Sequence, residues 1–219
     1  MFKKATIYGE RCSGTNYLEQ LLILNFNVEI VWDYGWKHFF GYNDLTNSDD
    51  VLFIGIIRNL EDWINSLFRE KYHLPYELTE TVDTYLNNQF YSILKNNDEI
   101  MYDRNIETGE RYKNIFELRL IKNKFLVEQM KVLVKNYCLI IYDNLVNNFT
   151  VVMNKLKDCG LEVKNEDTFP LNVLSYNGWE NAVFVKKQNT IPIEKINEKL
   201  RDIPELVYYE NILFPEITK

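Results

Sequence analysis

The chain of 219 residues lacks long apolar runs and contains little cysteine, proline or glycine. No stretch reaches the roughly eighteen consecutive apolar residues of a membrane-spanning helix, and the start, Met-Phe-Lys-Lys, leads into an expected strand without a signal-peptide core. We therefore expect a cytoplasmic protein with no membrane partner. Five prolines and eight glycines form no linker, so we expect one domain over residues 1–219.

Cysteine usage and charge limit the expected partners. Cys12, Cys138 and Cys159 are odd in number and lack metal-ligand spacing, so we expect a reducing compartment and no bound metal. The net charge is −7, whereas a nucleic acid or heparin-like glycan normally binds a basic surface. We therefore expect no nucleic-acid partner. The sequence does not indicate an oligomeric state.

Apolar periodicity predicts an alternation of strands and helices. This order is typical of an α/β fold with a central parallel sheet flanked by helices. We expect a helical insertion at about 74–135, in which aromatic residues form either core or acceptor-binding surface. Strands are expected at 4–8, 26–32, 51–57, 137–142 and 181–186, and helices at 14–24, 60–71, 78–96, 114–135, 150–159 and 193–201.

A loop with the residues of an anion site follows the first expected strand. Its Ser-Gly-Thr at 13–15 would place backbone N–H groups and two hydroxyls at the positive end of the next helix. Ser-Gly-Thr is also a common helix cap, but its position after an N-terminal strand favours anion binding. A Walker A loop carries a lysine that is absent here, so we expect a ligand other than ordinary ATP.

A second polar motif follows the expected strand at 51–57, whose continuous apolar run is typical of a strand buried on both faces. Arg58-Asn59 ends this strand, and Ser66 lies about two turns along the next helix. Arg58 and Ser66 can bind one phosphate together, although each can also be an ordinary surface residue. Because ligands bind at the carboxyl ends of parallel strands, both motifs are predicted to serve one nucleotide site.

These segments, in this order, resemble the sulfotransferase family, whose members transfer a sulfuryl group from 3′-phosphoadenosine 5′-phosphosulfate (PAPS). The Ser-Gly-Thr at 13–15 is similar to the family's 5′-phosphosulfate loop, and Arg58-Asn59 with Ser66 eight residues on is similar to its 3′-phosphate motif. Tyr-Asp-Asn-Leu at 142–145 resembles its Tyr-Glu-Asp-Leu segment. The resemblance spans residues 5–160 and implies a three-layer, P-loop-like fold with PAPS as co-substrate.

The resemblance also implies which residues bind the donor. The family usually has Lys or Arg directly before Ser-Gly-Thr, where this chain has cysteine with an arginine one place earlier. The family's glycine-rich segment near the C-terminus is absent, and two adjacent lysines are candidate replacements, although such lysines are more often solvated. The expected donor-binding residues are Arg11, Cys12, Ser13, Gly14, Thr15, Asn16, Arg58, Ser66, Lys186 and Lys187.

The candidate catalytic segment is Gly-Trp-Lys-His-Phe at 35–39, in the place of the family's Lys-x-His. Transfer to a hydroxyl needs a base and cations that stabilise developing negative charge, which suits His38 and Lys37 respectively. Lys37 can alternatively hold a phosphate. Neighbours in a strand point to opposite faces, so one of the two points away unless the strand has ended. His38 can also be a packed core histidine, and His73 is the second candidate base.

Together these features predict a PAPS-dependent sulfotransferase whose acceptor is a hydroxyl or amine of a small molecule or carbohydrate. One alternative is a P-loop kinase acting on a nucleoside or small metabolite, which the missing loop lysine disfavours. The other is a degenerate, non-catalytic nucleotide-binding member of the fold, and Cys12 in the loop keeps this alternative open.

Overall fold

The computed structural model describes residues 1–165, 168–171 and 188–215. Within these residues the sheet has four parallel strands, in the order β2-β1-β3-β4. The strands predicted at 4–8, 51–57 and 137–142 are confirmed to within one residue, whereas the one predicted at 26–32 is reduced to two residues at the sheet edge. The strands are β1 (Lys4–Tyr8), β2 (Glu29–Ile30), β3 (Val51–Ile57) and β4 (Tyr137–Ile141).

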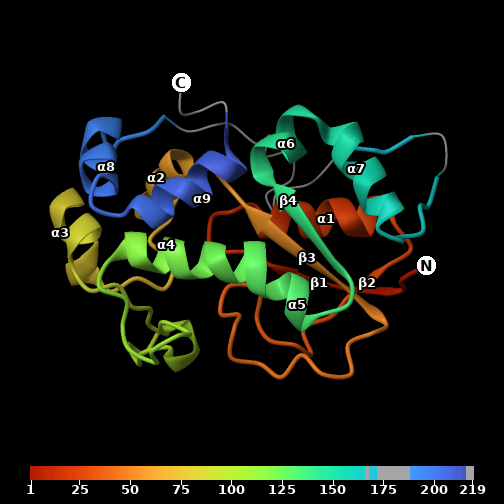
Figure 1. The fold of residues 1–219 in the computed structure, drawn as a ribbon, viewed down its shortest axis with the longest axis horizontal. Coiled ribbons are helices and arrows are strands. Elements are labelled where there is room, and N and C mark those ends of the chain that lie inside the picture. The colour runs from red at the N-terminus through yellow and green to blue at the C-terminus, as the bar shows by residue number, and fades with distance from the viewer. Residues whose placement is uncertain (166–167, 172–187, 216–219) are drawn as a thin grey trace.

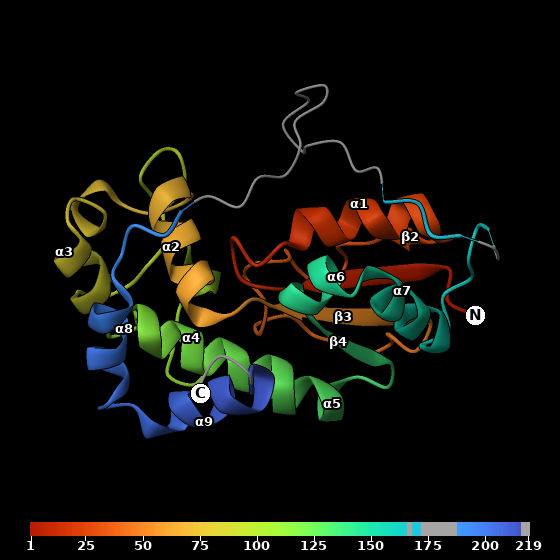
Figure 2. The same ribbon diagram turned by 90° about the horizontal axis from the view of Figure 1, so that it is seen from above.

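Helices cover both faces of the sheet, so the α/β class with a central parallel sheet is confirmed (Figures 1 and 2). One face carries α1 (Thr15–Asn25), α6 (Tyr142–Asn147) and α7 (Phe149–Asp158). The other carries α4 (Ile115–Lys124), a π-helical turn (Phe125–Gln129) and α5 (Met130–Leu133), with α9 (Pro204–Leu213) packed on α4. The helix predicted at 114–135 is therefore confirmed, but α6 and α9 were not predicted.

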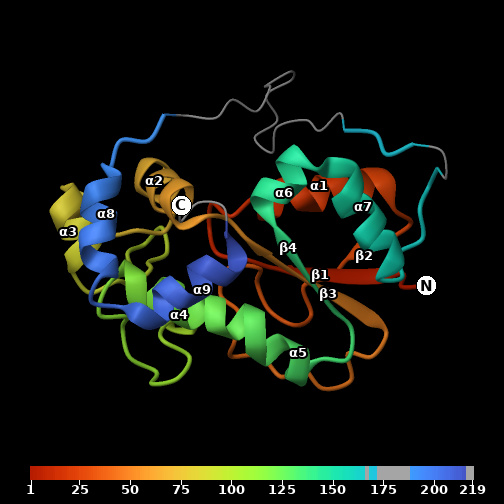
Figure 3. The same cartoon turned by 45° about the horizontal axis from the view of Figure 1, so that its top comes forward.

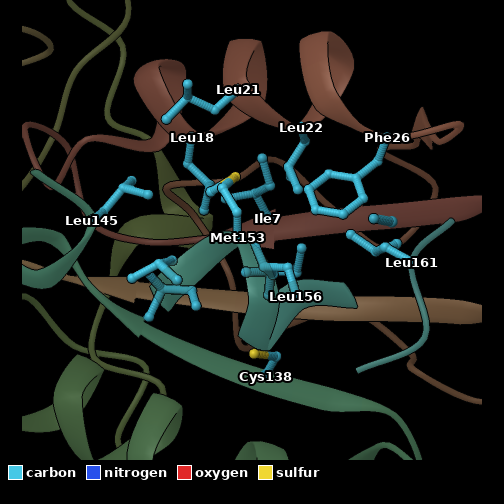
Figure 4. Packing of buried hydrophobic residues seen from close by; sticks show 14 of the residues in the cluster. Ile7, Leu18, Leu21, Leu22, Phe26, Cys138, Leu145, Met153, Leu156 and Leu161 are labelled. Atoms are coloured by element: carbon cyan, nitrogen blue, oxygen red, sulfur yellow. The ribbon is translucent and has the colours of Figure 1, made fainter. Parts of the chain in front are cut away.

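Alternate side chains of β3 pack into two different cores. Ile54 and Ile56 join the cluster beneath α1 and α7, where Leu18 and Met153 also pack (Figure 4). Phe53 packs on the opposite side of the sheet, with the residues of the π-helical turn and α5. Every residue of β3 is buried, which explains its continuous apolar sequence.

The remaining helices lie beyond the carboxyl ends of the strands. They are α2 (Leu60–Glu70), a 3₁₀ turn (Tyr76–Leu78), α3 (Val82–Asn87), a second 3₁₀ turn (Met101–Asp103) and α8 (Ile193–Leu200). Figure 3 shows α3 beside α8, and a Lys195–Asp83 ion pair of 2.8 Å joins them.

Of the helix predicted at 78–96, only α3 is α-helical, and the rest of the prediction is wrong. A Thr81 capping box starts α3, and the backbone becomes extended at Asn88. An antiparallel bridge then pairs Phe90 with Tyr112, so their rings enter the core from a loop. The strand predicted at 181–186 lies outside the described residues, as do Lys186 and Lys187. Among the described helices, none combines the length and the apolar character needed to cross a bilayer.

The strand order creates a crevice between β1 and β3. From β1 the chain passes through α1 to β2 on one side, whereas from β3 it passes through α4 and α5 to β4 on the other. The connections cover opposite faces, so they diverge where β1 and β3 end (Figure 2). Open α/β sheets bind ligands at such a switch point. The loop after Tyr8 and the turn at Arg58 both lie there, because Tyr8 pairs with Gly55 in register.

Candidate functional site

A cleft of about 520 Å³ opens at this switch point. It brings together most of the predicted site residues, and Tyr17, Trp36, Glu70, Tyr72, His73 and Tyr142 complete its described lining. Ser13 is buried behind the loop, where it lines a much smaller cavity with Glu10 and Lys122. The predicted residues that line the cleft are Arg11, Cys12, Gly14, Thr15, Asn16, Lys37, His38, Arg58 and Ser66.

The loop presents the N-terminus of α1 to the cleft. Gly14 caps this helix in the left-handed region, with φ +92°, and no side chain caps it. The first-turn N–H groups of any helix lack partners within the helix, and the dipole makes this end favourable for an anion. A Cβ at Gly14 would lie 2.5 Å from Cε2 of Tyr142, so both backbone angle and space require glycine here.

Arg58 forms part of the cleft wall and retains a donor that has no partner. Its side chain is 9% exposed, its Nη1 donates to the Cys12 carbonyl at 3.3 Å, and its guanidinium lies 4.9 Å from the centre of the Tyr142 ring. Asp62 is 3.9 Å from Nη2. Within the described structure, the buried Nε has no hydrogen-bond partner.

Two networks hold the turn that carries Arg58. Asp143 accepts hydrogen bonds from the backbone N–H and the Nδ2 of Asn59, at 3.3 and 2.9 Å. Arg119 on α4 donates to the Arg58 carbonyl at 2.6 Å and is fixed by a buried ion pair with Glu210, at 2.8 Å. Sequence analysis missed these supports. A cation at 119 between Leu118 and Leu120 was the available signal, but it does not identify the partner.

Lys37 and His38 both line the cleft, because β2 has ended before them and strand alternation no longer applies. The ammonium of Lys37 donates to Asn16 Oδ1 at 2.5 Å and to Glu19 Oε2 at 2.9 Å, and it lies 5.1 Å from the centre of the Trp36 ring. Its charge is therefore compensated by α1, next to the loop where an anion would bind.

His38 is held as a neutral imidazole. Its Nδ1 lies 2.8 Å from the Gly9 carbonyl, which can only accept, so Nδ1 carries the proton and Nε2 has a free lone pair. Burial lowers the pKa of His38 to about 3, although the bond to Gly9 opposes this, and nearby cations including Arg11 and Lys37 lower it further. His73, the second candidate base, also lines the cleft, and its Nδ1 is 3.1 Å from the Ile93 carbonyl.

Arg11 and Cys12 border the cleft, but neither is arranged as a ready ligand for an anion. Arg11 is buried, and its three guanidinium nitrogens donate to Glu10, Asp103 and the Tyr72 carbonyl, at 3.1–3.2 Å. Burial raises the pKa of the Cys12 thiol to about 11, so it is protonated at neutral pH and does not act as a reactive thiolate.

Comparison with known proteins identifies no relative: no family model, no curated protein and no solved structure matches the chain. Among the described residues, no group of three or more His, Cys, Asp or Glu side chains is arranged to hold a metal ion. The case for a function therefore rests on the residues of the cleft.

Proposed function

We propose that this protein is a sulfotransferase with a P-loop-like core that moves a sulfuryl group from PAPS to a hydroxyl or amine of a small-molecule or carbohydrate acceptor. One observation carries the proposal: the uncapped N-terminus of α1, the Arg58 side chain and His38, whose Nδ1 is bonded to Gly9, line one cleft. They come from distant segments of the chain, and this convergence is more informative than any of the motifs alone.

A nucleotide with anionic groups at two ends fits this arrangement. The N-terminus of α1, with Thr15 and Asn16, would receive the 5′-phosphosulfate. Arg58 and Ser66 would receive the 3′-phosphate, because both line the same cleft and a guanidinium and a hydroxyl both donate to phosphate oxygens. A nucleotide without a 3′-phosphate would lack this contact.

The expected chemistry is an in-line transfer without a covalent enzyme intermediate. His38 Nε2 accepts the proton of the acceptor, the acceptor oxygen or nitrogen forms a bond to sulfur, and the bond from sulfur to the 5′-phosphate oxygen breaks. The leaving group is adenosine 3′,5′-bisphosphate, whose new charge would be stabilised by the N-terminus of α1 and by Lys37. Phosphates bound near His38 would raise its low pKa, because an opposite charge favours the protonated form.

A non-catalytic nucleotide-binding protein is the second candidate. The observation that favours it is charge compensation: Glu19 pairs with Lys37, and Glu10 and Asp103 pair with Arg11. Paired cations stabilise the negative charge of a leaving group less than unpaired ones. Under this candidate the protein would bind the bisphosphate without turnover, and His38→Ala would leave binding unchanged.

The first test is the thermal shift of the protein with adenosine 3′,5′-bisphosphate, ADP or ATP-Mg. A ligand at about 100 times its Kd stabilises the native state by about 2.7 kcal/mol, which raises Tm by several degrees. We expect selective stabilisation by the 3′,5′-bisphosphate and its loss in Arg58→Ala. Arg69→Ala is the matched control, because Arg69 lies on the following helix and donates to the Gln188 carbonyl.

The other outcomes separate the alternatives. Stabilisation by ATP-Mg alone would refute the sulfotransferase proposal and support a kinase. No shift with any of the three would refute a nucleotide site. If the bisphosphate binds, transfer of radioactive sulfate from PAPS to a panel of acceptors tests catalysis, and His38→Ala should abolish transfer while binding is retained.

A further inference from the structure

Four acidic and basic side chains meet behind the loop, where Glu10 and Lys122 line the smaller cavity, and one of the four, Arg11, also borders the cleft. Glu10 and Arg11 come from the loop, Asp103 from a 3₁₀ turn and Lys122 from α4, and no side chain is more than 6% exposed. Arg11 lies 3.1 Å from Asp103, and Lys122 lies 2.7 Å from Asp103 and 3.5 Å from Glu10. The two positive and two negative charges balance, so the cluster can stay ionised in the interior.

Lys122 connects this cluster to the catalytic segment. Its ammonium donates to the His38 carbonyl at 2.7 Å, in addition to Asp103, and lies 4.7 Å from the centre of the Phe40 ring. The Glu10 carboxylate adds an ion pair with the ammonium at 3.5 Å. The side chain therefore has a single well-defined position, and through it the His38 backbone has one too.

The segment around His38 is attached to the loop at two further points. The Gly9 N–H donates to the Lys37 carbonyl at 2.9 Å, and the His38 ring donates through Nδ1 to the Gly9 carbonyl at 2.8 Å. The Nδ1 bond requires the ring to lie close to Gly9, and the ring can do so only while its backbone is held. Lys122 holds that backbone through the His38 carbonyl.

We propose that Lys122 is a positioning residue for His38: it holds the His38 backbone so that Nδ1 keeps its bond to Gly9 and Nε2 presents a lone pair to the cleft. The inference rests on the proposed function, in which His38 is the base. Asp103 and Glu10 compensate the charge of Lys122 and fix its ammonium. Without this tether, the ring leaves Gly9 and part of the population carries its proton on Nε2, where it cannot accept a proton from the acceptor.

Nitrogen NMR of the imidazole rings tests the proposal without any donor or acceptor. The chain has two histidines, so His73→Gln leaves the signals of His38 alone. In this background we expect one tautomer, protonated on Nδ1. In Lys122→Met/Asp103→Asn, which removes one charge of each sign and leaves Arg11 paired with Glu10, we expect a second set of signals with a protonated Nε2. Lys124→Met is the matched control, because Lys124 lies on the same helix and pairs with Glu107 near the surface.

Kinetics give a second readout once an acceptor is known. We expect kcat to fall about tenfold or more in the double variant, with KM for the donor changed less than about twofold, because general-base catalysis contributes about 10²–10⁴-fold. A folded double variant that keeps one tautomer and full kcat would show that Lys122 is only structural and would overturn the proposal. So would a wild-type His38 protonated on Nε2.

Two further outcomes of the experiment can also be interpreted. If the double variant does not fold, Asp103→Asn alone loosens Lys122 without removing it, and the same second tautomer is expected; its absence would contradict the proposal. If the wild type fails to bind the bisphosphate, the proposed function fails, while the tautomer measurement still reports whether Lys122 positions His38.

Discussion

Replacing Gly14 with alanine adds one methyl group and tests how closely the loop packs on the Tyr142 ring. The backbone there has φ +92°, and the new Cβ would lie 2.5 Å from Cε2 of Tyr142. A left-handed backbone costs an L-residue roughly 1–2 kcal/mol. Forcing a packed ring to move costs roughly 1–3 kcal/mol more. We therefore expect Gly14→Ala to lower the free energy of unfolding by about 2–5 kcal/mol.

Urea unfolding followed by tryptophan fluorescence measures this change, and two variants divide it into parts. Gly109 has φ +75° and nothing within 4 Å of its added Cβ, so Gly109→Ala reports the backbone cost alone. Gly14→Ala/Tyr142→Leu removes the ring and should recover the packing cost. If Gly14→Ala costs no more than Gly109→Ala, the contact between the loop and Tyr142 is refuted, and with it our account of why the loop needs glycine.

Two further predictions concern titratable groups. The pKa of His38 is about 3 in the folded protein and about 6.5 when unfolded, so the unfolded state binds more protons between these values. Stability should fall as pH drops from about 6.5 towards 3, by at most about 1.4 kcal/mol per pH unit. His38→Gln should flatten this part of a urea–pH series, and an unchanged curve would contradict a neutral His38 imidazole. The hydrogen bond with Cys138 lowers the pKa of Cys159 to about 7, whereas burial raises that of Cys12 to about 11. Limited iodoacetamide treatment with mass spectrometry should find Cys159 alkylated at least about tenfold faster than Cys12, and faster labelling of Cys12 would contradict both environments.

The parts of the fold that were predictable are those in which local pattern and tertiary environment agree. β3 is buried along its whole length, so its sequence is continuously apolar and its bounds were predicted to the residue. The helix prediction at 78–96 was mostly wrong because local pattern and tertiary environment disagree there. Its aromatic residues lie at helical spacing, but Phe90 reaches the core through a bridge to Tyr112, a contact 22 positions away that no local pattern contains.

The candidate site shows the same division. Gly14 and Arg58 were predicted to share a site because carboxyl ends of parallel strands meet at one edge, and His38 was a candidate from the family resemblance; all three line one cleft. The groups that hold them were not predicted. Arg119 and Glu210 are 91 positions apart in the sequence. A charged residue that is expected to be buried implies a partner of opposite charge, but the sequence does not identify that partner.

Charge compensation in the cleft determines how an acidic protein can bind an anion. Lys37 is paired with Glu19 at 2.9 Å, whereas Arg58 has a longer contact with Asp62, at 3.9 Å, so the attraction comes mainly from the N-terminus of α1 and from Arg58. Arg58 is largely buried, so salt screens its interaction with a bound phosphate only weakly. The net charge of −7 meanwhile disfavours anions that touch only the surface. Under the proposed function, a nucleotide with phosphates at both ends would contact both points at once, whereas a simple phosphate would contact one.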